Sequence, residues 1–175
     1  MRSKLFNSVE EESPISICDE RGRLEVLFEN QDFTLKRSHS HRGVFRGLHI
    51  QLPPFAQRKL IRVLSGELID VILDCCPASS TFGCWDRQNM TPASGCILIP
   101  EYFAHGFFCK TDVVFEYLCL GSPYSPEHER CLKVLPEMIP DIKLEEVSLS
   151  AKDNKGFELN KFLGQFEGVA WADYE

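Results

Sequence analysis

The sequence predicts an all-β domain, either a barrel or a double-sheet jelly roll, and three observations support this. Short runs of β-branched and other apolar residues follow one another from about Ile15 to Leu120. Glycine, proline and serine separate these runs, which is the pattern of many short strands joined by turns. The 175 residues suffice for one domain with its own core and are too few for two ordinary ones.

The first elements can be assigned in order along the chain. Residues 1–14 are polar and acidic, and they predict a flexible N-terminal arm ahead of a single domain over residues 15–175. Residues 60–64 and 67–73 are apolar runs separated by a serine and a glycine, so they predict a β-hairpin.

Later elements are shorter and end in a polar region. Further strands are expected at residues 81–85, 96–100 and 113–118. Residues 141–175 are less periodic, and they predict one or two short helices, for example over residues 160–166, packed on the outside of the barrel.

Charge and hydropathy exclude several classes of function. The formal net charge is −7, so no nucleic-acid partner is expected, because such partners require clustered positive charge. No apolar run is long enough to span a bilayer, and the N-terminus is acidic where a signal peptide would be apolar. These features predict a soluble cytoplasmic protein without a membrane partner.

The eight cysteines are expected to be free thiols. No pair has the C-x-x-C spacing, and most lie inside apolar, strand-like runs. Buried cysteines of this kind behave as small hydrophobic residues in a reducing compartment. The sequence therefore favours neither disulfides nor a zinc site built from cysteines.

Four neighbouring residues indicate chemistry. Arg46, Gly47 and His49 lie in one strand-like run, and Lys59 follows ten residues later. A histidine in such a run is more often structural than catalytic, but here a base with a near-neutral pKa has a cation on either side. A base and fixed positive charge are what the formation of an enolate requires.

A metal centre is not expected. Barrels of this class often bind metals through His-x-His, a carboxylate and a third histidine, but His49 is followed by Ile50 and Gln51. His39 and His41 have the right spacing, yet no further ligands are evident near them. The sequence therefore predicts neither a metal nor another cofactor.

A series of short motifs runs through most of the chain in a fixed order. They are Asp19-Glu20-Arg21-Gly22, Gly43-Val44-Phe45-Arg46-Gly47-Leu48-His49-Ile50-Gln51, Pro53-Pro54-x-Ala56-Gln57-x-Lys59-Leu60, Gly66-Glu67-x-x-Asp70-Val71, Ser80-Thr81-Phe82-Gly83-x-Trp85, Ile99-Pro100-Glu101-x-Phe103-Ala104-His105-Gly106-Phe107, Tyr124-Ser125-Pro126-Glu127-His128-Glu129-Arg130 and Leu149-Ser150-x-Lys152-Asp153. In these motifs, over residues 19–153, the sequence resembles the dTDP-4-dehydrorhamnose 3,5-epimerase family.

The resemblance implies a fold and a reaction. The expected fold is a cupin jelly-roll, a double-stranded β-barrel with short peripheral C-terminal helices, in a homodimer that holds no metal and no cofactor. The expected reaction, in deoxysugar biosynthesis, removes a proton beside the C4 ketone of a nucleotide-linked 4-keto-6-deoxyhexose, with dTDP as the expected nucleotide. The carbon is then reprotonated from the opposite face.

The resemblance also implies roles for single residues. His49 matches the base, and Asp153 matches the carboxylate that orients it. Lys59 matches the cation beside the C4 oxygen, where negative charge develops. Arg46 and Arg21 match contacts to the diphosphate, Arg21 by reaching into the site of the partner subunit.

The acid that protonates the opposite face can be placed in two ways. Counting without gaps puts Leu118 at the family's tyrosine position, whereas Tyr117 stands one residue earlier. Because side chains alternate between the faces of a strand, the choice also decides whether Glu116 points into the barrel. Tyr117 is the favoured acid, since an unpaired Glu116 inside the barrel would be costly.

Four further residues are expected at the substrate. Gln51 and His105 match positions near the ligand, and Tyr124 is expected against the nucleotide base. Lys36 stands where the family has asparagine, which leaves the exact sugar and nucleotide open. Other functions also remain open, namely a 3-epimerase, a 3,4-ketoisomerase, a non-catalytic sugar-nucleotide-binding cupin or a metal-dependent oxygenase.

Overall fold

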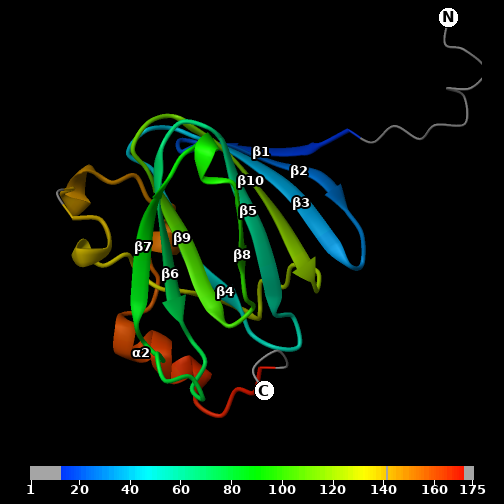
Figure 1. Ribbon diagram of the computed structural model, residues 1–175, viewed down its shortest axis with the longest axis vertical. Helices are drawn as coiled ribbons and strands as arrows, with labels where there is room; N and C mark the ends of the chain where they lie inside the picture. Colours follow the sequence, from blue (N-terminus) through cyan, green and yellow to red (C-terminus); the bar gives the residue numbers. More distant parts are fainter. Residues whose placement is uncertain (1–12, 141, 172–175) are drawn as a thin grey trace, which may run out of the picture.

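Two antiparallel β-sheets face each other in the computed structural model, which describes residues 13–140 and 142–171 (Figure 1). The first sheet contains, in spatial order, β1 (Ile15–Asp19), β2 (Gly22–Glu29), β3 (Phe33–Ser40), β10 (Val113–Gly121), β5 (Gln57–Ser65) and β8 (Cys96–Ile99). The second contains β11 (Glu129–Cys131), β4 (Phe45–Gln51), β9 (Phe103–Cys109), β6 (Leu68–Asp74) and β7 (Trp85–Met90). The predicted all-β jelly roll is confirmed.

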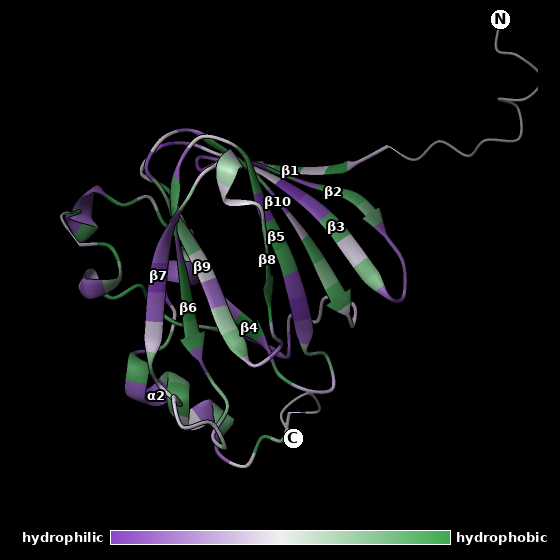
Figure 2. Ribbon diagram, viewed as in Figure 1, coloured by the Kyte–Doolittle hydropathy of each residue, from purple (hydrophilic) through white to green (hydrophobic). Residues whose placement is uncertain are grey.

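The space between the sheets holds one of two hydrophobic clusters. In β5 its members Ile61 and Val63 stand on either side of the exposed Arg62, because only one face of that strand is buried. Figure 2 shows hydrophobic bands on strands of both sheets. The fully or nearly buried side chains are Val44, Ile61, Val63, Leu68, Met90, Ile99, Phe107, Cys109, Val113 and Phe115. This cluster fills one part of the space between the sheets, and a cavity occupies the rest.

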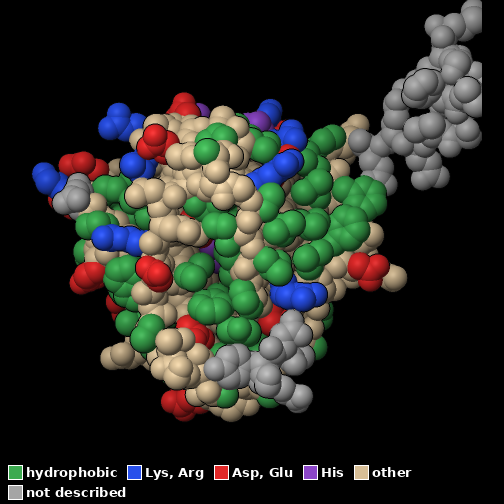
Figure 3. All heavy atoms as spheres, viewed as in Figure 1, with side chains coloured by type: hydrophobic (Ala, Val, Ile, Leu, Met, Phe, Trp, Pro, Cys, Tyr) green, Lys and Arg blue, Asp and Glu red, His purple; other side chains and the backbone are tan. Residues whose placement is uncertain are grey.

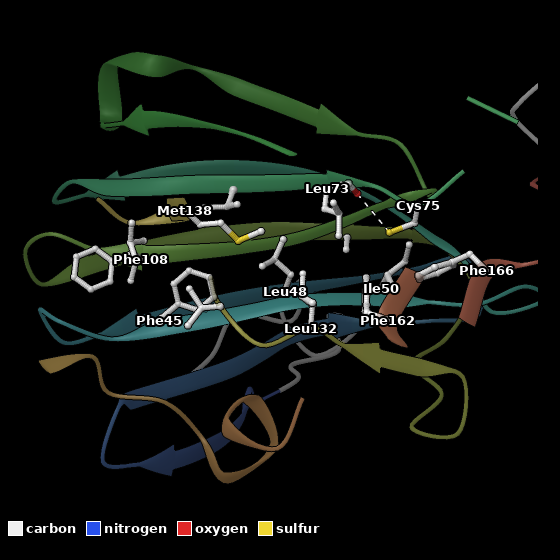
Figure 4. Packing of buried hydrophobic residues seen from close by; sticks show 14 of the residues in the cluster. Phe45, Leu48, Ile50, Leu73, Cys75, Phe108, Leu132, Met138, Phe162 and Phe166 are labelled. Atoms are coloured by element: carbon white, nitrogen blue, oxygen red, sulfur yellow. Dashed lines mark hydrogen bonds between the residues drawn. The ribbon is translucent and has the colours of Figure 1, made fainter. Parts of the chain in front are cut away.

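The second cluster lies on the outer face of the second sheet. Short helical segments cover that face, namely η3 (Pro136–Met138), η4 (Leu144–Glu146), α2 (Leu159–Leu163) and η5 (Gly164–Phe166). A further short helix, α1 (Ala151–Asn154), lies beside β4. Figure 4 shows Phe162 and Phe166 among the side chains that join this cluster. The helix predicted over residues 160–166 is present as α2 and η5. Phe162 and Phe166 are both fully buried, so this helical segment forms part of the core.

The predicted hairpin over residues 60–73 is wrong. β5 pairs with β10 and β8, whereas β6 pairs with β9 and β7, so the two strands belong to different sheets. The turn at Gly66, which has φ +84°, carries the chain from one sheet to the other. A hairpin and such a crossing require the same pattern of two strands and a glycine turn, so the sequence does not distinguish them.

The strand predicted at residues 81–85 is also wrong, because these residues form a turn and β7 begins at Trp85. Side chains hold the turn: the Thr81 hydroxyl donates a 2.7 Å hydrogen bond to Asp74. The strands expected at 96–100 and 113–118 are present as β8 and β10.

The remaining expectations concern the termini and the cysteines. Most of the predicted arm, residues 1–12, lies outside the described residues. Among the described helices, none has the length and apolar character needed to cross a membrane. All eight cysteines are free, and five of them are buried.

Candidate active site

A cavity of about 480 Å³ lies between the two sheets, and polar side chains from both sheets enter it. The charged and titratable residues that line it are Arg21, Glu29, Lys36, Arg46, His49, Lys59, His105, Tyr117, Tyr124, Glu129 and Lys152. Eight of the ten residues that the sequence assigned to the site are among these, and Asp153 lies directly behind His49.

A β-bulge in β4 places Arg46 and His49 on the same face. Arg46 pairs with Phe107 and His49 pairs with His105, so β4 has one residue more than β9 over this stretch. Without the bulge, residues three apart would face opposite sides of the sheet. Gly47 makes the bulge possible: its φ is +111°, and an added Cβ would lie 2.6 Å from the Cα of Gly106.

His49 and Asp153 form a closely hydrogen-bonded pair, with 2.6 Å between Nε2 and Oδ1. The Asp153 side chain is fully buried, and Arg21 lies 3.2 Å from its other oxygen. Burial opposes ionisation, but the hydrogen bond and charge of His49, with Ser150 and Arg21, hold the pKa of Asp153 below its ordinary value. A carboxylate that accepts the Nε2 proton leaves Nδ1 of the neutral ring as a base.

Three cations line the cavity without a carboxylate partner. Lys59 donates to the backbone oxygen of His49 at 3.1 Å, and Arg46 donates to the Ser40 hydroxyl at 2.8 Å. Lys36 lies 5.3 Å from the centre of the Tyr124 ring. Within the described part of the chain, none of the three forms an ion pair, so the cavity is suited to an anionic ligand. Burial lowers the pKa values of Lys59 and Arg46.

Tyr117, and not Leu118, lines the cavity. The expected register is therefore confirmed, with Phe115 and Tyr117 pointing inward from β10. Glu116 points to the opposite face, where Arg37 and Arg62 donate to it at 2.9 and 3.0 Å. Burial raises the pKa of Tyr117, so its hydroxyl stays protonated and can supply a proton.

A carboxylate that the sequence left without a role organises one wall of the cavity. Tyr124 and Lys152 both donate to Glu129, at 2.9 and 2.6 Å. Burial raises the pKa of Tyr124 to about 12. The other oxygen of Glu129 lies 3.9 Å from Nδ1 of His49. Glu129 and Lys152 belong to two of the motifs, but a motif does not reveal that its side chains will meet.

The family model described as dTDP-4-dehydrorhamnose 3,5-epimerase matches residues 9–161. This chain belongs to that family. Three epimerases of this name illustrate the likeness, from Sinorhizobium fredii (46% identical over 52% of this chain and 47% of the relative), Pseudomonas aeruginosa (40%, over 68% and 67%) and Mycolicibacterium smegmatis (30%, over 92% and 86%). The first two relatives found, from Sinorhizobium fredii and Shigella flexneri, are matched over about half of their length.

Solved epimerase structures share the fold. The enzyme from Sulfolobus tokodaii is 33% identical with a TM-score of 0.66, over 83% of this chain and 87% of that one. The Legionella pneumophila enzyme, in complex with dTDP-4-keto-L-rhamnose, is 32% identical with a TM-score of 0.64, over 87% and 88%. The predicted cupin jelly-roll with short C-terminal helices is thereby confirmed.

Two residues lie differently in this epimerase-family chain from what the sequence implied. Gln51 does not line the cavity; its amide group holds the loops around it through Phe55 and Ser125. Arg21 was expected in the partner's site, but it lies in the cavity of its own chain and contacts Asp153 there. His105 does line the cavity, held by a 2.6 Å contact with Asp70.

Proposed function

We propose that this chain is an epimerase that inverts C3 and C5 of a dTDP-linked 4-keto-6-deoxyhexose. Family membership supports the reaction class, and the Legionella pneumophila relative was solved with a ligand of this type. The observation that carries the proposal is the His49–Asp153 pair with Lys59 beside it in a cavity of unpaired cations.

The first half of the reaction is a proton transfer from carbon. Nδ1 of His49 takes the proton beside the C4 ketone, and the electrons move to the ketone oxygen to give an enolate. Asp153 stabilises the imidazolium that forms. Lys59 stabilises the oxyanion, and because it lies partly buried in the cavity, less water screens its charge than at the protein surface.

The second half delivers a proton to the other face. Tyr117 donates its hydroxyl proton to the same carbon, and the enolate returns to the ketone. Arg46, Lys36 and Arg21 supply positive charge for the diphosphate, with Tyr124 and His105 as further contacts to the nucleotide sugar. No step in this sequence needs a metal or another cofactor.

The decisive experiment follows solvent deuterium into the sugar. We expect NMR to show deuterium at C3 and C5 of dTDP-4-keto-6-deoxyglucose when the protein is added in D₂O. His49→Ala should abolish exchange at both carbons, whereas His41→Ala, at an exposed histidine outside the cavity, should leave it intact. Exchange that survives His49→Ala would contradict the assignment of the base.

The same spectra separate the alternatives. Exchange and inversion at C3 alone would identify a 3-epimerase, and a carbonyl that moves to C3 would identify a ketoisomerase. Binding of the sugar nucleotide without exchange at either carbon would leave a non-catalytic binding protein.

We also propose that the chain works as a cytoplasmic homodimer. β1 is an edge strand whose Ile15 and Ile17 are 66% and 57% exposed, and Phe28 of β2 is 40% exposed. Figure 3 shows hydrophobic side chains gathered over this part of the molecule. An apolar edge of this kind is suited to a partner. Sedimentation at several concentrations tests the dimer; a monomer throughout would contradict it.

A further inference from the structure

Cys131 is a buried thiol at the catalytic pair for which the proposed reaction has no use. It lies in β11 directly opposite His49 of β4. Its thiol donates to Oδ1 of Asp153 at 3.5 Å, the same oxygen that contacts His49. The sulfur of Cys131 and Nε2 of His49 therefore both lie close to the same carboxylate oxygen of Asp153.

These three atoms have the arrangement of a metal-binding group. The ligand atoms of His49, Cys131 and Asp153 all lie within 4.8 Å of one another. In a tetrahedral zinc site, ligand atoms stand about 3.4–3.6 Å apart. The 2.6 Å His49–Asp153 contact would have to lengthen by about 1 Å to reach this spacing.

We propose that Cys131, His49 and Asp153 form an inhibitory site for a soft divalent cation, Zn²⁺ or Cd²⁺. Thiolate and imidazole are the ligands that such ions prefer. When the thiol gives up its proton to solvent, thiolate and carboxylate together match the charge of the ion. Arg21 opposes a cation here, but it contacts Oδ2 of Asp153 and leaves Oδ1 available.

Occupancy of this site would remove the base. A metal on Nε2 of a neutral imidazole leaves its one proton on Nδ1, so Nδ1 can no longer accept a proton from carbon. The metal would also take over the oxygen of Asp153 that orients the ring. This inhibition rests on the proposed function, whereas binding of the ion does not.

Binding is tested first, because it needs no substrate. Cd²⁺ is titrated into the full-length protein, and the ultraviolet charge-transfer absorption of the cadmium–thiolate bond is recorded. Cys131→Ala should remove the tightest-binding component. Cys75→Ala is the matched control, because Cys75 is also buried but its thiol contacts the backbone oxygen of Leu73. His49→Asn, which keeps the thiol, should weaken the same component.

Inhibition is tested second, with each variant compared with its own rate in the presence of a chelator. Zn²⁺ should inhibit the wild type and Cys75→Ala alike. For Cys131→Ala, the inhibitory concentration should rise by at least the roughly 10- to 100-fold that loss of a supporting group costs a metal site. Equal inhibition of all three, or cadmium absorption unchanged in Cys131→Ala, would overturn the proposal. If no substrate is turned over, the proposed function fails, and the cadmium titration still decides the site.

Discussion

At the scale of single residues, burial favours the neutral form of two groups in the same cavity, and their pKa values therefore move in opposite directions. Lys59 loses solvation, so the pKa of its ammonium falls below that of an ordinary lysine. Tyr117 is partly buried as well, and its pKa rises. The two shifts leave a cation that loses its charge at a lower pH than an ordinary lysine, beside an acid that keeps its proton to a higher pH than an ordinary tyrosine.

This difference predicts the alkaline limb of the pH profile. Lys59 is charged below its lowered pKa and neutral above it, so kcat/KM should fall as pH rises through that value. Tyr117 cannot cause the fall, because its raised pKa keeps it protonated. Lys59→Arg should move the limb to higher pH, since arginine stays charged. An unmoved limb in Lys59→Arg would show that another group titrates.

Removing the positive charge of Lys59 should lower activity more than the Lys59→Arg substitution, which only moves the alkaline limb of the pH profile. Lys59→Met should lower kcat by roughly 100- to 1,000-fold, as loss of one preorganised donor to an oxyanion does. Lys143→Met, the same substitution at an exposed lysine outside the cavity, should leave kcat unchanged. Steady-state kinetics on the 4-keto sugar nucleotide makes the comparison.

Removing the acid should separate proton loss from inversion. Tyr117→Phe keeps the ring in the cavity but has no proton to give, so inversion should fall by roughly 100- to 10,000-fold. His49 can still remove and return a proton on its own face, so solvent deuterium should continue to enter the substrate without inversion. NMR of recovered substrate tests this, and equal loss of exchange and inversion would refute the assigned role.

At the scale of elements, the bulge in β4 does what a regular strand cannot. It brings Arg46 and His49 to one face, so a single strand supplies both a cation and an imidazole to the cavity. The bulge requires a backbone conformation at Gly47 that glycine alone adopts easily, and Gly47 packs against the backbone of β9.

The bulge therefore predicts a sensitive glycine. Gly47→Ala should lower the free energy of unfolding by about 1–3 kcal/mol from backbone strain, and by more where the new Cβ meets Gly106. Gly164→Ala is the control, because Gly164 is helical with open space around it, and a gain of about 0.4–1 kcal/mol is expected. Urea denaturation measures both; equal stabilities would mean that β4 tolerates a Cβ at the bulge.

At the scale of the whole molecule, local patterns predicted most strands but not how they pair. Alternating apolar residues mark β5 and β6 correctly, yet only the distant strands β10 and β9 decide that they enter different sheets. The turn at residues 81–85 was missed because its apolar residues resemble a strand, while the bond from Thr81 to Asp74 depends on the fold.

The site was predictable in its composition and less so in its contacts. Motifs identified His49, Lys59 and Asp153, and the fold brings them together from β4, β5 and α1. Nothing local in the sequence shows that Glu129 would meet Tyr124 and Lys152, or that Gln51 would support loops instead of lining the cavity.

The C-terminal segment connects stability with chemistry, because it supplies Asp153 and is anchored by aromatic residues that follow. Phe162 packs into the outer cluster with Phe166, at 5.1 Å between ring centres. Phe162→Ala should cost about 3–5 kcal/mol of unfolding free energy. It should also lower kcat in the molecules that remain folded, since the segment holding Asp153 loosens.

The matched control is Phe157→Ala, in the same segment but with its side chain 39% exposed. It should cost well under half as much stability and leave kcat unchanged, because less apolar area is lost from the core. Urea denaturation and kinetics at a temperature where all variants are folded provide the comparison. A Phe162→Ala protein that is destabilised but has full kcat would show that Asp153 stays in place without the outer core, through its own contacts with Ser150, Arg21 and His49.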